Sequence, residues 1–289
     1  MLQNMNGDLI PVDRFVDLSG LRLHFLDWGG EGAPIVILHA TGFLGRIYQP
    51  IAQALTPIGH VYTLDQRGHG DSARPHPETY EWDLTVRDLE DFMLATGLVH
   101  ARALGHSAGA TAMGALASRR PDLIARSVLV EPVIFEADDR ADGSGGRPDE
   151  LYERTLKRKR SFDSVEAMFE NFKSKPPYDT WRRDILRDYC EYGTSPDADG
   201  RRVLKCLPET EAAIYGSARN FDGLGYLLRC AVPMLVMFGA QTNTEGVTLA
   251  DKIRAPHRRV VIVPGTSHFM PMERPDIVAQ MAFDFMRPE

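Results

Sequence analysis

The feature that most constrains this chain is a serine set among small residues, between a strand pattern and a helix pattern. The pentapeptide at 105–109 reads GHSAG, the apolar run 101–106 precedes the serine, and the small apolar segment 108–118 follows it. A turn from strand to helix at this point strains its apex residue, and small neighbours are needed for the two elements to approach. The pattern therefore predicts a sharp turn that presents the hydroxyl of Ser107 at a sheet edge.

Strand and helix signals alternate through most of the chain. Segments 14–18 and 21–28 predict a hairpin with its turn at Ser19-Gly20. Short apolar runs, typical of strands buried on both faces of a parallel sheet, lie at 34–39, 61–65, 101–106, 128–131, 233–239 and 259–263. Helical patterns lie at 44–55, 83–96, 108–118 and 275–286. The sequence thus predicts an α/β fold, a mostly parallel sheet with helices on both faces.

The alternation stops after Glu131 and resumes only at Pro233. Residues 135–148 are rich in glycine and aspartate and predict a loop, and residues 150–229 give helical signals with no convincing strand. We therefore expect a core domain formed by 1–134 and 230–289, with an inserted helical cap at 135–229.

Composition excludes several classes of partner. The net charge of −7 argues against a surface for nucleic acid or anionic lipid, and no run of about 18 apolar residues predicts a membrane span. The three cysteines match no zinc pattern and are expected to be free thiols. Residues 1–11 lack a secretory pattern, so we expect a cytoplasmic protein. We expect it to be a monomer or a homodimer. No metal or cofactor site is predicted.

A serine hydroxyl needs a general base to act as a nucleophile. In a fold of this kind the base follows the last strand, and His268 lies just after the strand predicted at 259–263. His257 precedes that strand and so lies at the wrong end of the sheet. His39, His69 and His106 belong to turns and are interpreted as structural. We therefore predict Ser107 as nucleophile, favoured by its place at a helix N-terminus, and His268 as base.

The carboxylate that should orient His268 is less evident. The loop after the strand at 233–239 usually supplies it, but the expected position holds Thr242. Glu131 ends another buried strand, where a carboxylate needs a partner, and is the favoured candidate. Glu245 stays open as the alternative, and so does a helix N-terminal role for that residue.

Two backbone N–H groups should bind the oxyanion of a tetrahedral intermediate. We predict the N–H of Ala108, which follows the nucleophile, and that of Thr41, in the small-residue loop 39–43. The glycine-rich segment 65–72 (DQRGHGDS) lacks the ending of a phosphate-binding loop and predicts a structural turn. The basic stretch 154–160 (RTLKRKR) is interpreted as a solvated helix face.

Together, HATG at 39–42, DQRGHGDS at 65–72, GHSAG at 105–109 and PGTSH at 264–268 resemble the α/β-hydrolase superfamily. The resemblance covers the whole chain except the cap, and departs from the usual pattern at Ala40 and Thr242. The position of Glu131 is similar to a subset that places its acid there. Haloalkane dehalogenases share that acid position, but they and epoxide hydrolases use an aspartate nucleophile, which Ser107 argues against. LVEP with FGAQTNTEG looks most like zearalenone-type lactone hydrolases.

The resulting expectation is a serine hydrolase acting on a small, mainly apolar ester or lactone, without a cofactor. The cap and the sheet edge should enclose an apolar pocket, to which we assign Phe43, Phe135, Trp181, Tyr215 and Phe269. Two alternatives stay open: a carbon–carbon bond hydrolase of a diketone-like substrate, and a ligand sensor with slow turnover.

Overall fold

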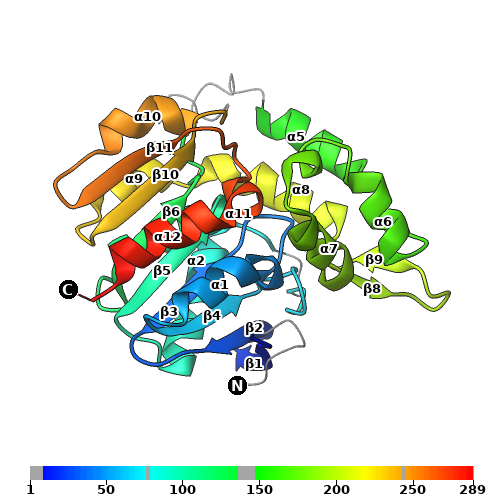
Figure 1. The fold of residues 1–289 in the computed structure, drawn as a ribbon, viewed down its shortest axis with the longest axis horizontal. Coiled ribbons are helices and arrows are strands. Elements are labelled where there is room, and N and C mark those ends of the chain that lie inside the picture. The colour runs from blue at the N-terminus through cyan, green and yellow to red at the C-terminus, as the bar shows by residue number, and fades with distance from the viewer. Residues whose placement is uncertain (1–8, 76–78, 136–146, 243–244, 289) are drawn as a thin grey trace.

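The structure, a computed structural model, describes residues 9–75, 79–135, 147–242 and 245–288. Its main feature is an eight-stranded sheet with the order β1-β2-β4-β3-β5-β6-β10-β11 (Figure 1). The strands are β1 (Val12–Leu18), β2 (Leu21–Gly29), β3 (Pro34–Leu38), β4 (His60–Leu64), β5 (Ala101–His106), β6 (Ile124–Val130), β10 (Met234–Gly239) and β11 (Arg258–Val263). β1 and β2 form an antiparallel hairpin and β2 runs antiparallel to β4, whereas the pairs from β4 to β11 are parallel. The predicted α/β fold is confirmed.

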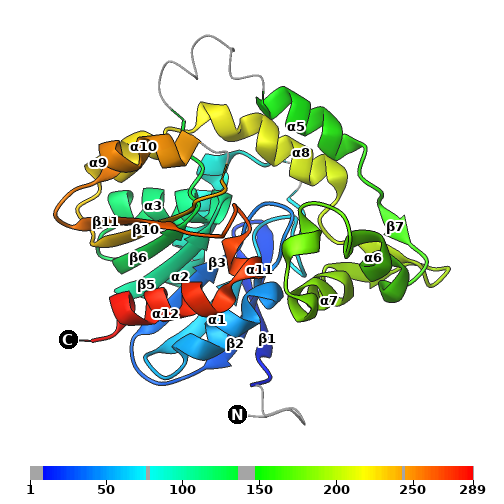
Figure 2. The same ribbon diagram turned by 45° about the horizontal axis from the view of Figure 1, so that its top comes forward.

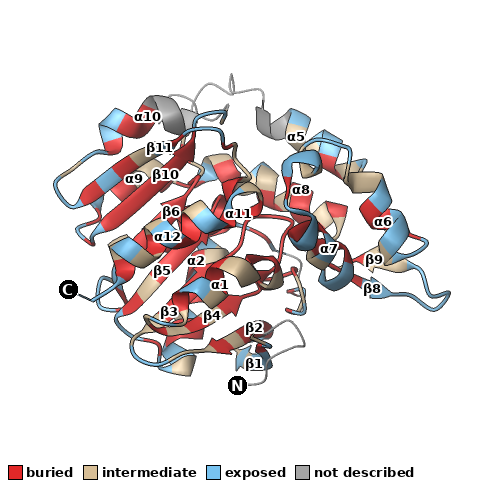
Figure 3. Cartoon of the chain, in the orientation of Figure 1, coloured by how far each residue is buried: buried red, intermediate tan, exposed pale blue. Residues whose placement is uncertain are grey.

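Helices cover both faces of this sheet because its central strands are apolar on both sides. In β3, Ile35 and Ile37 belong to one buried cluster and Val36 and Leu38 to the other, as the alternation of side chains in a strand requires. The first cluster also takes in α1 (Gln49–Leu55) and α12 (Pro275–Met286), and the second α2 (Trp82–Thr96), α3 (Ala108–Arg119) and α10 (Glu245–Ile253). Figure 3 shows the strands between these layers as largely buried.

The chain between β6 and β10 gathers mainly at one end of the sheet, as both ribbon views show (Figures 1 and 2). Its helices are α5 (Arg147–Leu156), α6 (Val165–Phe172), η2 (Tyr178–Thr180), α7 (Arg183–Tyr192), α8 (Pro208–Ser217), η3 (Ala218–Asn220) and α9 (Gly223–Arg229). The expectation of no strand here is wrong: β7 (Ser161–Phe162), β9 (Arg202–Leu204) and β8 (Thr194–Pro196) form a small antiparallel sheet. Strands this short show no readable alternation in sequence.

The last helix of this segment returns to the sheet domain. Gly223 at the start of α9 lies against Thr111 of α3, and a methyl group on Gly114 would lie 2.7 Å from a Leu227 side-chain carbon. α9 therefore packs on α3, whose small residues permit the approach.

The cysteines and the helix lengths bear on two expectations from the sequence. Cys190, Cys206 and Cys230 are free thiols, as predicted, and all three are buried. Within the described ranges, no helix has both the length and the apolar character required to cross a bilayer.

Candidate active site

Ser107 stands at the turn between β5 and α3 in a strained conformation. Its φ of 56° and ψ of −124° lie outside the regions that residues with a side chain normally occupy. A methyl group on Gly109 would lie 2.4 Å from the carbonyl oxygen of His39, and one on Gly105 would lie 2.5 Å from the Cα of Ala110. Both positions therefore require glycine, and the predicted sharp turn is what the structure shows.

His268 lies between Ser107 and Glu131, with one ring nitrogen facing each. Its Nε2 is 3.0 Å from the Ser107 Oγ, and its Nδ1 is 3.2 Å from the Glu131 Oε2. The histidine follows β11, at the edge of the sheet where β5 and β6 also end. The parallel strands thus bring together three residues that are far apart in the chain.

Glu131 is held in place from a second side. Its carboxyl group is buried, and its other oxygen, Oε1, accepts a hydrogen bond from the main-chain N–H of Gly239 at the end of β10. Its φ of 54° lies in the left-handed region, which a glutamate rarely adopts. This backbone aims the side chain across the end of β10 toward His268.

Two further positions bear on the choice of acid. Thr242 is a threonine and offers His268 no carboxylate. Its buried hydroxyl has no hydrogen-bond partner among the described residues. The side chain of Glu245 lies outside the described part of the chain.

Ala108 directly follows the nucleophile, and Thr41 lies in the loop after β3, the strand that pairs with β5. The N–H groups of Thr41 and Ala108 donate to no protein acceptor in the described parts of the chain. The N–H of the next residue, Gly42, donates to the Nε2 of His69 over 2.9 Å. Burial, and then the charge of His39, lower the pKa of His69 to about 3, so this ring is neutral. The Nδ1 of His69 donates to the Arg67 carbonyl, which leaves Nε2 as an acceptor that fixes the loop.

The turn at 65–72 supports this loop in a second way. The Asp65 carboxylate accepts hydrogen bonds from the N–H groups of Gly45 and Asp71.

His24, Asp65 and Asp71 offer possible metal-ligand atoms within 4.8 Å of one another. Both ring nitrogens of His24 already meet carboxylates, those of Asp65 and Asp13 at 2.7 and 3.0 Å. We interpret this cluster as an ion pair that holds the turn.

Three of the five predicted pocket residues form one aromatic group beside His268. The ring of Phe43 is 5.1 Å from that of Trp181 and 6.2 Å from that of Phe269, and Phe269 is 5.5 Å from the His268 ring. The indole N–H of Trp181 is buried and has no partner among the described residues.

The other two predicted residues make no ring contact with this aromatic group among the described residues. Phe135 packs on the cluster that contains α2 and α3. Tyr215 donates its hydroxyl hydrogen bond to Glu211 over 3.2 Å, within a polar group. Their place in a substrate pocket stays a prediction, because sequence does not reveal which face of a cap helix each residue occupies.

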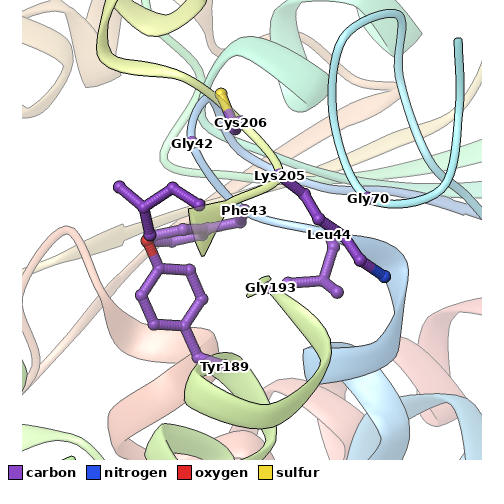
Figure 4. Close-up of a pocket in the computed structure, with 9 residues that line it drawn as sticks. Gly42, Phe43, Leu44, Gly70, Tyr189, Gly193, Lys205 and Cys206 are labelled. Carbon is purple, nitrogen blue, oxygen red and sulfur yellow. The ribbon is translucent and has the colours of Figure 1, made fainter. Parts of the chain in front are cut away.

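Figure 4 shows a small pocket beside Gly42 and Phe43, in the loop after β3. It has a volume of about 10 Å³, roughly the room of one water molecule, and Gly42, Phe43, Tyr189 and Cys206 are among its lining residues. Its lining does not include Ser107 or His268.

The contacts of His106 agree with the structural role expected for it, but sequence reasoning did not identify its partners. Its Nε2 contacts the main-chain carbonyl of His268, and its Nδ1 contacts the hydroxyl of Tyr48. The imidazole in the GHSAG pentapeptide was the available signal, but nothing in the sequence showed its partners.

Comparison with known proteins places this chain in a family. Residues 35–281 match the alpha/beta hydrolase family. A 2-(acetamidomethylene)succinate hydrolase from Mesorhizobium japonicum is 24% identical over 95% of both chains. An N-formylmaleamate deformylase from Pseudomonas putida is 33% identical, over 44% of this chain and 47% of its own.

Other matches carry different activities or show the fold alone. A non-heme chloroperoxidase from Kitasatospora aureofaciens is 24% identical over 88% of this chain and 91% of its own. The crystal structure of an E-2-(acetamidomethylene)succinate hydrolase superposes with a TM-score of 0.84 at 23% identity, covering 96% and 99% of the two chains. The family match spans most of the sequence, and the chain belongs to the alpha/beta hydrolase family.

Proposed function

We propose that this hydrolase cleaves a carboxylic ester or lactone through an acyl-enzyme formed on Ser107. The observation that supports this most directly is the pair of contacts made by His268, 3.0 Å to the Ser107 Oγ and 3.2 Å to the Glu131 carboxylate. A nucleophile, a base and an orienting acid in this order are what acyl transfer requires.

In the proposed reaction His268 takes the hydroxyl proton as the Ser107 oxygen attacks the substrate carbonyl. The oxyanion that forms accepts hydrogen bonds from the N–H groups of Thr41 and Ala108. His268 then gives its proton to the departing alkoxide, and the acyl group stays on Ser107. Water attacks this ester with His268 again as base, which releases the carboxylic acid and restores the hydroxyl.

Glu131 serves as the third member of this triad. The Nδ1–H of His268 donates to Glu131 Oε2, which fixes the tautomer and stabilises the imidazolium that forms during both proton transfers. The Gly239 N–H on the other carboxylate oxygen limits rotation of the acid.

Residues 135–229 are proposed to form the cap over this site, with 1–134 and 230–289 as the core. Trp181 of the cap meets Phe43 and Phe269 of the core beside His268, which favours an apolar part of the substrate there. A small-molecule substrate and a reaction without cofactor are part of the same proposal.

The C–N bond of an amide is a second candidate for the bond that is cleaved. The names of the relatives above include an acetamidomethylene compound and an N-formyl compound, and the same triad can expel a protonated amine. Only the leaving group differs from the ester reaction, since the acyl-enzyme forms in the same way.

The test is turnover on a panel of aryl esters, lactones and matched anilides, with Ser107→Ala and Glu131→Gln beside the wild type. Multiple turnover that Ser107→Ala abolishes is expected, and the panel ranks esters against amides. A wild type that releases one equivalent and stops would instead favour the sensor. Inactivity on the whole panel, together with bleaching of a ring-fission product, would favour carbon–carbon cleavage.

A further inference from the structure

The basic stretch 154–160 was interpreted as a solvated face, but Arg158 in it points inward. Its side chain is only 21% exposed and pairs with the carboxylate of Glu211 on α8. Its Nη2 also contacts the hydroxyls of Tyr178 and Tyr189 at 3.2 and 3.1 Å. A charged side chain in the interior needs such partners, so the solvated interpretation is wrong for this residue.

This polar group lies against the loop that carries the proposed oxyanion donor. A methyl group on Gly42 would lie 3.0 Å from the carboxyl carbon of Glu211, and Gly42 directly follows Thr41. The ring of Tyr189 is 5.9 Å from that of Phe43, and Figure 4 shows both side chains at the small pocket there. Arg158 therefore stands a short distance from the place where the substrate carbonyl would lie.

The group is rich in hydrogen-bond donors. A guanidinium carries five N–H donors and no acceptor. Burial raises the pKa of Tyr178 and Tyr189, so both hydroxyls keep their protons. The indole N–H of Trp181, which has no partner in the described part of the chain, lies nearby, since its ring is 5.0 Å from that of Tyr178. Glu211 is the carboxylate that faces Arg158 here.

Electrostatics also favours a role beyond packing. A buried ion pair is often no more stabilising than apolar residues of the same volume. A carboxylate beside the oxyanion loop would oppose the negative charge that develops in the reaction, unless a cation balances it. Arg158 provides that balance, and its planar guanidinium can bind a second carboxylate with two parallel hydrogen bonds.

We propose that Arg158, with Tyr178, Tyr189 and the Trp181 indole, binds a carboxylate that the substrate carries a few carbon atoms from its scissile bond. This deepens the function proposed above and rests on it. The substrate is then the ester or amide of a small molecule that bears a free carboxylate. Glu211 is the internal counter-ion of Arg158 in the empty site and shares the guanidinium when the substrate binds.

Paired substrates that differ only in charge test this directly. One pair is the 4-nitrophenyl hemiester of glutaric acid against 4-nitrophenyl pentanoate, with the charge on the acyl side. The other is the butyrate ester of 4-hydroxybenzoate against that of its methyl ester, with the charge on the leaving group. The wild type should show a higher kcat/KM for the anionic member of at least one pair.

Arg158→Met should lower kcat/KM for that anionic substrate about 10- to 100-fold, the loss of one charged hydrogen bond. The neutral partner should lose clearly less than the anionic one, because it lacks the carboxylate contact and is affected only by the unbalanced charge of Glu211. Arg187→Met is the matched control, because this cap arginine is half exposed and pairs with Glu166 at the surface. Arg158→Lys keeps the charge but loses the planar group that can donate two parallel hydrogen bonds. Its kcat/KM for the anionic substrate should lie between those of the wild type and Arg158→Met.

Glu211→Gln removes the competing carboxylate and should raise the preference for the anionic substrate. A wild type that prefers the neutral member of both pairs would overturn the proposal. So would an Arg158→Met variant that is folded and loses activity equally on both members, since that indicates a structural role.

A binding measurement separates this proposal from the catalytic one. Glutarate should raise the Tm of Ser107→Ala and leave that of Ser107→Ala/Arg158→Met unchanged, whatever the enzyme hydrolyses. A shift in Tm without hydrolysis of any ester would keep the carboxylate site and reject the esterase. Ester hydrolysis with no preference for the anionic substrate, and with no shift in Tm on adding glutarate, would keep the esterase and reject the carboxylate site.

Discussion

The Nε2 of His106 donates a hydrogen bond to the main-chain carbonyl oxygen of His268, 2.8 Å away. Burial, and then the charge of His268, lower the pKa of His106 to about 3, so this ring is neutral at ordinary pH and carries one N–H. Its Nδ1 accepts from the hydroxyl of Tyr48 at 2.7 Å, and that oxygen accepts from the N–H of Ala40 at 3.2 Å. One buried chain thus joins the oxyanion loop to the loop of the proposed base.

We predict that breaking this chain impairs the proposed reaction more than substrate binding. Tyr48→Phe leaves two buried groups without a partner, at a cost of about 1–3 kcal/mol in the free energy of unfolding. Because His268 is then less well oriented, kcat should fall about tenfold with KM nearly unchanged. Steady-state kinetics on folded protein check this, with His257→Gln, whose ring contacts the Cys230 carbonyl, as control. An unchanged kcat in Tyr48→Phe would show that the chain only stabilises the fold.

Glu131→Gln should lower kcat by about 10³-fold or more, because a neutral amide neither stabilises the imidazolium nor enforces its tautomer. Thr242 lies where this fold usually carries its acid, and its buried hydroxyl lacks a partner among the described residues. We therefore expect Thr242→Asp to restore part of the activity in the Glu131→Gln background, measured as kcat on the best ester. Full activity of Glu131→Gln alone would remove Glu131 from the triad.

The fold could be predicted from sequence because strong periodic signals coincided with the observed strands. The apolar run 34–39 and the small-residue segment 108–118 lie within one residue of β3 and α3 at each end. Ser107 and His268 were predictable for the same reason, since the order of strands alone places both at one edge of the sheet.

The contacts within the cap could not be predicted in this way. Arg158 belongs to a charged stretch whose neighbours Lys157 and Lys159 are exposed, and only tertiary packing with Glu211 turns it inward. His106 likewise has a role only through the folded positions of Tyr48 and His268. Such relations depend on which elements meet in space, which local patterns do not encode.

The turn between β5 and α3, which carries Ser107, should not tolerate a side chain at Gly109. Gly109→Ala brings its methyl group to 2.4 and 2.5 Å from the carbonyl oxygens of His39 and Leu38, which are backbone atoms that cannot yield easily. We expect the free energy of unfolding to fall by about 3 kcal/mol or more. Gly97→Ala is the control, because its positive φ is strained but its surroundings are open, and it should cost about 1 kcal/mol. Chemical denaturation compares them, and equal losses would contradict the close approach.

The buried pair of His24 and Asp65 should make stability depend on pH. Burial alone would lower the pKa of His24, but the hydrogen bond and charge of Asp65 outweigh it, and the net pKa is raised. Burial would raise the pKa of Asp65, but His24 outweighs it, and the net pKa is lowered. The contribution of Asp65 is lost as the pH falls through its lowered pKa, and that of His24 as the pH rises through its raised one. The pair is therefore most stabilising between about pH 4 and 6.5.

His24→Gln should accordingly lower the free energy of unfolding by about 3–5 kcal/mol near pH 5.5. The loss should be smaller at pH 9, where His24 of the wild type is also neutral. His60→Gln removes a more exposed histidine that pairs with Asp27, and should cost less than about 1 kcal/mol. Denaturant titrations at the two pH values provide the comparison, and a loss that is the same at both would contradict the ion pair.

The most direct test of the central claim is the mass of the acyl-enzyme. A 4-nitrophenyl ester mixed with the protein at millisecond times should release one equivalent of nitrophenol in a burst. The intact mass should rise by that of the acyl group, with the modification on the peptide that contains Ser107. His268→Ala should abolish the burst, and Ser107→Ala should abolish both burst and mass shift. Turnover by Ser107→Ala, or an acyl group found on another residue, would contradict the account.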